Sequence, residues 1–277
     1  MQLSNDLVNS WIEKEPNEYL KKIKKKIIRN ISYVSPEVFE SKLRESTFNA
    51  FKKINEEFVV LWDYKPHSSK RWVYYKILDI LPKKPVLASY YAPTAELLAY
   101  KNNSQFVGTI DYMINKNIGT LVIFDDAAYS AEQLINRIIL PISKIYSSKN
   151  KQLKIYLVIP FITNLAKRNI DLAIKNNSLI KVELYYSQIM KNLLEILSES
   201  EINTLKTLDK EEFRYLGCTL TFFDHRVADD HSFFEEVERL IIKSKKPYSS
   251  ESAYGEQEKK DWDNYWTFYL GNIKKED

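Results

Sequence analysis

Two adjacent carboxylates stand at the end of an apolar run near the middle of the chain. Asp125 and Asp126 follow Leu121–Phe124, and the short loop Ala127–Ala131 leads from them into a helical pattern. Carboxylates at a strand end can accept hydrogen bonds from the vicinal hydroxyls of a sugar, or hold magnesium directly or through water. The N–H groups and positive dipole end of a helix N-terminus favour a phosphate, and the Ser130 hydroxyl can donate to a phosphate oxygen. These residue types predict a site for a phosphorylated sugar.

The same residues also fit a purely structural role. Asp126 or Ser130 can act as the N-cap of the following helix, with Asp125 exposed to solvent. The chain has no nucleophile elbow, no Gly-rich dinucleotide fingerprint and no P-loop, since its five glycines lie far apart. The alternation of strands and helices around the segment favours the ligand site over the simple cap.

A donor-rich loop, Asp63–Arg71, follows the first predicted core strand, Phe58–Trp62. The side chains that can bind an anion here are Lys65, His67, Ser68, Ser69, Lys70 and Arg71. The alternative is a solvated basic loop that caps the helix predicted over Arg71–Leu81.

A second polar segment, Thr221–Ser232, follows the apolar run Cys218–Phe223. A transition-metal site is conceivable from the ligand types, Asp224, His225, Asp229 and His231. Their spacing matches no metal motif, however, and a structured polar turn in which Asp230 caps a helix Ser232–Ile242 is favoured over a metal site.

The elements that must position these residues follow from the apolar pattern. Near-continuous apolar strands such as Leu121–Phe124 suit a parallel sheet that is covered on both faces, and strand–helix alternation indicates a doubly wound sheet. The predicted strands are Phe58–Trp62, Pro85–Ser89, Thr120–Phe124, Lys154–Ile159, Lys181–Tyr185 and Cys218–Phe223. The predicted helices are Arg71–Leu81, Thr94–Lys101, Ala131–Ile139, Asn164–Lys175, Gln188–Ser198 and Ser232–Ile242. Ligands bind such sheets at the carboxyl ends of the strands.

A helical segment precedes this pattern. Leu20, Ile23, Ile27 and Ile31 recur at helical spacing, so the basic run Lys21–Arg29 is read as the solvated side of an amphipathic helix. A second helix should start with Ser35 as N-cap and Pro36 as its first residue. Its expected buried face comprises Val38, Phe39, Leu43, Phe48, Phe51 and Ile54. We therefore expect a helical segment 1–57 packed on an α/β domain 58–277.

Composition limits the class of protein. The chain has 277 residues, 44% of them hydrophobic, and a net charge of +4, which is too small an excess to indicate nucleic acid. The single cysteine, Cys218, excludes an internal disulfide, and no apolar run is long enough for a membrane span or a secretory signal. These features favour a cytoplasmic protein, with export as an effector left open. The aromatic tail Asp261–Leu270 should dock on the domain or on a second copy.

The segment Thr120–Gln133 resembles the phosphoribosyl-diphosphate (PRPP) motif of the type I phosphoribosyltransferases. Four apolar residues, two acids, a short small-residue stretch and Ser130–Ala131 match that motif in type and order, with Ala131 and Glu132 where glycines are common. The resemblance implies a phosphoribosyltransferase-like fold. It assigns Asp125 and Asp126 to the ribose hydroxyls and magnesium. It assigns the 5′-phosphate to the loop Ala127, Ala128, Tyr129, Ser130, Ala131, Glu132 and Gln133.

The resemblance extends to the two secondary segments. In this family a loop after the first core strand binds the pyrophosphate, which implies that role for Lys65–Arg71. An acid after the last core strand helps to hold the metal-pyrophosphate, which implies Asp224, and a neighbour such as Phe223 would stack on the base. The expected activity is transfer of the phosphoribosyl group from magnesium-PRPP to an unidentified acceptor, with release of pyrophosphate.

Three alternatives remain open. The first is a catalytically degenerate sensor of a ribose phosphate or nucleotide, which the glycine-poor loop favours. The second is an interaction or effector protein that keeps the fold without the ligand. The third is another α/β enzyme that uses the paired aspartates for metal-dependent phosphate chemistry.

Overall fold

The computed structural model of the chain describes residues 2–62, 69–81, 86–89, 113–175, 178–208, 219–223 and 240–242. Within them, a parallel five-stranded sheet has the order β4 (Val86–Ser89), β3 (Val59–Trp62), β5 (Thr120–Phe124), β7 (Leu153–Val158) and β9 (Ile180–Tyr185). The five predicted strands of this sheet are thereby confirmed, with bounds that shift by one residue at most. The parallel α/β class is also confirmed.

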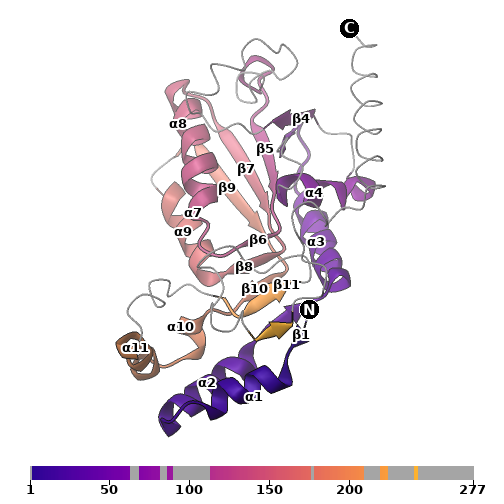
Figure 1. Ribbon diagram of the computed structural model, residues 1–277. Helices are drawn as coiled ribbons and strands as arrows, with labels where there is room; N and C mark the ends of the chain where they lie inside the picture. The colour runs from indigo at the N-terminus through magenta and orange to yellow at the C-terminus, as the bar shows by residue number, and fades with distance from the viewer. Residues whose placement is uncertain are drawn as a thin grey trace, which may run out of the picture.

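Helices cover both faces of this sheet (Figure 1). Side chains alternate along each strand, so that Leu121 and Ile123 contact one layer while Val122 and Phe124 contact the other. The first layer consists of α7 (Glu132–Leu134), the π-helical turn η3 (Ile135–Ile139), α8 (Leu140–Ser148) and α9 (Asn164–Ile174). The second consists of α3 (Pro36–Phe51), α4 (Ser69–Tyr75) and the 3-10 turn η1 (Leu78–Ile80).

Three adjacent strands break at the same level and then resume in a second parallel sheet. β6 (Ala127–Ala128), β8 (Phe161–Thr163) and β10 (Gln188–Met190) continue β5, β7 and β9 after two residues each. Each break reverses the side-chain alternation: Leu157 of β7 packs in the core under α8, whereas Phe161 of β8, four residues later, packs in the core under α3. The three strands thus turn together and keep their mutual register.

The predicted helix Gln188–Ser198 is wrong in its first part. Gln188–Met190 pairs with β8, and α10 covers only Leu193–Ile196. Asn192 and Glu195 form a capping box, in which each side chain accepts the backbone N–H of the other residue, so the helix starts only after Asn192.

The chain ends of the described part form a smaller lobe. α1 (Asn5–Glu13) and α2 (Glu18–Asn30) lie at the end of the molecule remote from α8, beside α10 and α11 (Glu199–Leu208) (Figure 1). The apolar face predicted for α2 is confirmed, because Leu20, Ile23 and Ile27 are buried. None of the described helices is long and apolar enough to cross a membrane.

The strand expected over Cys218–Phe223 does not join the main sheet. β11 (Thr221–Phe223) pairs in parallel with β2 (Ser32–Val34), and Ser32 and Thr221 share a hydrogen bond of 2.8 Å between their hydroxyls. The N-terminal segment supplies the partner strand, which sequence patterning alone did not reveal. Similarly, Ile241–Ile242 is a strand, β12, paired with β1 (Gln2–Leu3), so the helix predicted to end there is wrong at its end.

The helix α3 starts as predicted, with Ser35 as N-cap and Pro36 in its first turn, and it packs directly on the main sheet. Phe39 and Leu43 are buried, but Val38 is 44% exposed and Phe48 is 60% exposed, which corrects the expected buried face. The ammonium group of Lys52 lies over the Phe48 ring instead, 4.2 Å from the ring centre.

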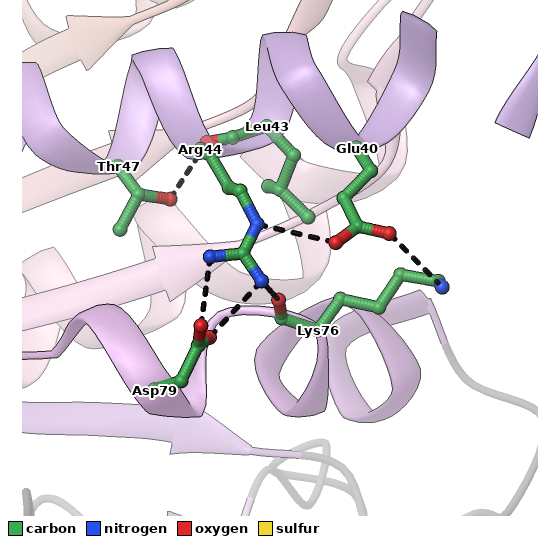
Figure 2. Close-up of polar contacts among 6 residues, drawn as sticks. All are labelled: Glu40, Leu43, Arg44, Thr47, Lys76 and Asp79. Carbon is green, nitrogen blue, oxygen red and sulfur yellow. Dashed lines mark hydrogen bonds and ion pairs between the residues drawn. The ribbon is translucent and has the colours of Figure 1, made fainter. Parts of the chain in front are cut away.

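A guanidinium fixes α3 to the segment after α4 (Figure 2). Arg44 Nη1 and Nη2 donate to the two carboxylate oxygens of Asp79 at 2.9 and 3.2 Å, and Nε donates to Glu40 at 3.2 Å. Nη2 also donates to the backbone carbonyl of Lys76 at 3.4 Å. This fork ties α3 to the turn that directly follows α4 on the same face of the sheet.

Candidate functional site

Asp125 lies where a doubly wound sheet conventionally binds ligands. The chain runs from β3 to β4 on one side and then returns to β5 on the other side of β3. The strand order therefore reverses between β3 and β5, and their carboxyl ends lie together, because Leu61 pairs with Ile123. A crevice at such a switch point is the usual ligand position in this class of fold.

Ser69 and Asp125 meet across this switch point. Ser69 Oγ donates a hydrogen bond to Asp125 Oδ1, and the same oxygen accepts the backbone N–H of Asp126 at 3.0 Å. The backbone N–H of Asp125 donates to the carbonyl of Val158 in β7 at 3.2 Å. The Asp125 side chain is only partly buried. The structure thus fixes a solvent-accessible carboxylate between the start of α4 and the end of β5.

Asp126 differs from its neighbour. It is 1% exposed, and its Oδ1 accepts the backbone N–H of Ala127 at 2.9 Å. The two carboxylates were expected to act as a pair on one ligand, but in this conformation only Asp125 of the two reaches solvent.

The loop predicted over Ala127–Ala131 is in part a strand, which corrects the sequence reading. Ala127 and Ala128 form β6 and pair with Phe161 and Ile162 of β8. Both alanines are buried, on opposite faces of the strand. Their small size therefore serves packing at the strand break, and the expected approach of a ligand to their backbone is not supported.

Tyr129 and Ser130 connect this strand to the following helix. The carbonyl of Tyr129 accepts from Thr163 Oγ1, and the carbonyl of Ser130 accepts from Asn169 Nδ2 at 3.0 Å. Ser130 Oγ accepts the backbone N–H of Glu132 at 3.3 Å, but the N-cap position itself is Ala131, so the prediction of Asp126 or Ser130 as the N-cap is wrong. Its hydroxyl proton is still available to a ligand, because accepting a bond leaves the donor in place.

Ala131 begins the helix in a left-handed backbone conformation, with φ 59° and ψ 12°. Such angles normally favour glycine, the residue that the resembling family commonly has here. Glu132 and Gln133 follow in the first turn with exposed side chains. The helix continues to Ser148, farther than the predicted Ile139, and Pro141 explains its π-helical turn, since proline cannot donate to a carbonyl in the preceding turn.

The donor-rich loop reaches the site through Ser69. The helix predicted over Arg71–Leu81 starts at Ser69, ends at Tyr75 and gives way to the 3-10 turn. Lys70 and Arg71 lie in its first turn, but their side chains are outside the described part, as are Lys65 and Ser68. Of the predicted anion ligands, the structure therefore places the side chain of Ser69 beside Asp125.

The predicted roles of Phe223 and Asp224 have different outcomes. Phe223 is 0% exposed and packs edge-on against Phe39 and Phe161, with ring centres 6.1 and 5.1 Å away. This packing does not support stacking of Phe223 on a bound base. Asp224 lies outside the described residues, as do the helix Thr94–Lys101, the acid–histidine cluster 224–231 and the aromatic tail.

Sequence reasoning missed one polar residue that organises the site. Thr163 is fully buried at the end of β8, and its Oγ1 accepts the backbone N–H of Ala166 at 3.0 Å while donating to Tyr129. A Thr directly before a helical pattern was the available signal. Asn164 and Glu195, which bond through their side chains, lie beside it.

The described residues fit magnesium only if the ion binds together with a phosphate-containing substrate that supplies most of its coordination. They contain no group of three or more acidic, histidine or cysteine side chains that could hold a metal ion. Magnesium commonly binds proteins through one or two carboxylates plus substrate phosphates, and keeps several waters. Asp125 can supply one such carboxylate.

Comparison with known proteins adds little to this geometry. No family model and no curated protein matches the chain. Among solved structures, a hypothetical protein from Neisseria gonorrhoeae with bound ppGpp is 8% identical, with a TM-score of 0.37 over 76% of this chain and 96% of that one. A protein from Aquifex aeolicus is 15% identical, with a TM-score of 0.34 over 71% and 89% of the two chains. At these TM-scores neither neighbour contributes to an assignment of function.

Proposed function

We propose that the chain is a phosphoribosyltransferase-like protein that binds magnesium-PRPP, or a related ribose phosphate, over the carboxyl end of β5. The observation that carries the proposal is the position of Asp125, a partly exposed carboxylate held by Ser69 at the switch point of a parallel sheet. The motif resemblance independently assigns the ribose hydroxyls to the same residue. A carboxylate that is already fixed loses little conformational entropy when a ligand binds.

Each described residue has a distinct part in this proposal. Asp125 accepts hydrogen bonds from the ribose hydroxyls and contacts the metal, while Ser69 holds its carboxylate in place. The Ser130 hydroxyl and the first turn of the helix after Ala131 face the 5′-phosphate, with the Glu132 side chain in solvent. Magnesium, when bound with PRPP, neutralises charge on the leaving pyrophosphate. Positioning and electrostatic stabilisation then supply the rate enhancement.

A second candidate is a sensor that binds a ribose phosphate without turnover. Several groups of the expected phosphate loop are engaged internally: Ala127 N–H bonds Asp126, Glu132 N–H bonds Ser130, and Ala127–Ala128 belong to a strand. This internal bonding leaves fewer donors for a phosphate than a glycine-rich loop offers. It is the observation that favours this second candidate.

Two measurements separate these candidates. Calorimetric titration with PRPP and magnesium tests binding, and release of pyrophosphate tests turnover. Binding together with release of pyrophosphate supports the transferase, whereas binding without release supports the sensor. Absence of binding to the folded wild type overturns both candidates. The remaining hypothesis is then an interaction protein that keeps the fold without binding the ligand.

A further inference from the structure

β9 forms one edge of the main sheet. In the described part of the chain no strand pairs with its outer side, and its six residues contain neither proline nor glycine. The backbone N–H of Leu153 donates to the carbonyl of Leu179, and that of Ile159 to the carbonyl of Tyr185, at 2.9 and 3.0 Å. Because backbone groups alternate between the two sides of a parallel strand, those of Ile180, Val182 and Leu184 point away from the sheet.

The sequence of this edge is complementary to itself. When two copies run antiparallel about a twofold axis at Val182, Ile180 lies opposite Leu184 and Lys181 lies opposite Glu183, each pair occurring twice. The outward backbone groups then belong to the hydrogen-bonded pairs of the ladder. Lys181 and Glu183 occupy the non-hydrogen-bonded pairs, where facing side chains approach most closely.

Charge selects this register over its neighbours. An axis at Lys181 would set two lysines opposite each other, and an axis at Glu183 would set two glutamates opposite each other. Lys181 is 69% exposed and forms an ion pair of 2.7 Å with Glu183 on its own strand, and Glu183 also lies 3.5 Å from Lys154 of β7. In the pairing each Lys181 would meet two carboxylates, and each Glu183 would gain a second Lys181 as a neighbour. Like charges directly opposite destabilise a strand pair, so neighbouring registers are penalised.

Pairing would also bury more apolar surface on one face of β9. Val182 and Leu184 lie on the face covered by α9, where they pack against the core but stay half-buried. A second copy would cover their exposed flanks. We infer that the outer edge of β9 binds a second copy of this chain through antiparallel pairing centred on Val182, which joins the two five-stranded sheets into one.

Sedimentation velocity of the full chain over a concentration series tests this interface. We expect a dimer in the wild type and at least a tenfold weaker association for Lys181→Glu or for Glu183→Lys. The double exchange Lys181→Glu/Glu183→Lys restores opposite charges in every facing pair and should return the dissociation constant to within about threefold of the wild type. Lys149 is an exposed lysine outside the proposed interface, and Lys149→Glu changes the net charge by the same amount as Lys181→Glu. This control variant should associate as the wild type does.

A cross-link identifies the contact directly. Facing Cα atoms in a hydrogen-bonded antiparallel pair lie about 5.5 Å apart, within disulfide range. In a Cys218→Ser background, Val182→Cys should therefore form a covalent dimer on mild oxidation, whereas Lys149→Cys should not. The inference is overturned if the wild type stays monomeric, or if the single charge variants associate as the wild type does. Failure of the double exchange to recover association, with circular dichroism unchanged, overturns it as well.

Discussion

Ser69 and Asp125, separated by 56 positions in the sequence, are joined by a hydrogen bond from Ser69 Oγ to Asp125 Oδ1. The bond links the first residue of α4 to the residue that follows β5, so it spans the switch point of the sheet. The more exposed of the two adjacent aspartates is thus positioned by a residue from the neighbouring βα connection.

The first prediction concerns this pair. Asp125→Asn should abolish binding of magnesium-PRPP, because an amide cannot replace a carboxylate toward the metal and the ribose hydroxyls. Ser69→Ala should weaken binding about threefold to tenfold, since it removes one hydrogen bond to a retained carboxylate. Calorimetry measures both effects. Asp171 is an exposed acid on α9, and the control variant Asp171→Asn should bind as tightly as the wild type does. If Asp125→Asn also binds with the affinity of the wild type, Asp125 does not contact the ligand.

The second prediction concerns the left-handed residue at the helix start. Ala131→Gly should change the free energy of unfolding by no more than about 0.5 kcal/mol, because relief of the left-handed strain offsets the lost methyl group and the greater chain entropy of glycine. Ala166→Gly, at a buried alanine of α9, should cost about 1–2 kcal/mol. Urea denaturation compares the two. Equal losses for both variants would contradict the strain at Ala131.

The third prediction concerns pH. The hydrogen bonds from Arg44 hold the pKa of the Asp79 carboxyl below its ordinary value of 3.8. A carboxyl whose pKa is lower in the folded state contributes stability above its unfolded pKa and loses that contribution as pH falls through the folded pKa. The wild type should therefore exceed Asp79→Asn in stability at neutral pH, and the difference should shrink steadily below about pH 4.

Thermal unfolding of both proteins between pH 7 and pH 2.5 measures this difference. Glu57→Gln, at an exposed acid, provides the control for loss of one negative charge. If the difference in stability between the wild type and Asp79→Asn stays constant over the whole pH range, the hydrogen bonds from Arg44 do not lower the pKa of the Asp79 carboxyl.

The fourth prediction concerns the buried hydroxyl of Thr163. Thr163→Val keeps the shape but leaves the Ala166 N–H and the Tyr129 carbonyl without this partner, which should cost about 1–2 kcal/mol of unfolding free energy. Thr163→Ser retains the hydroxyl and should lose less than half as much. Chemical denaturation ranks the two, and a valine variant as stable as the serine variant would rule out the capping role.

Periodicity predicted the elements whose apolar residues recur at the spacing of a helix or a strand. The five strands of the main sheet, the helix α2 and the Ser35–Pro36 start of α3 were all visible as apolar spacing or capping residues. Position at a strand end also drew attention to Asp125. These features are local, so a short window of sequence contains the information.

The errors arise where pairing partners are distant in sequence. Gln188–Met190 and Ala127–Ala128 are strands because β8 lies between them, and Thr221–Phe223 leaves the main sheet because Ser32–Val34 is available. Burial of Asp126 likewise depends on how the strand turns after Phe124. No local pattern distinguishes a loop of small residues from a short strand that resumes after a break.

The simultaneous break in three strands has a consequence for the evolution of the chain. Asp125–Asp126, Ile159–Pro160 and Tyr186–Ser187 each contribute two residues, and together they hold Ala127, Phe161 and Gln188 in one register. Loss or gain of one residue in any single break would move every side chain of the following strand to the opposite face of the sheet, while its two neighbours kept their faces. Relatives of this protein should therefore align without gaps through all three dipeptides, even where the dipeptides themselves have changed.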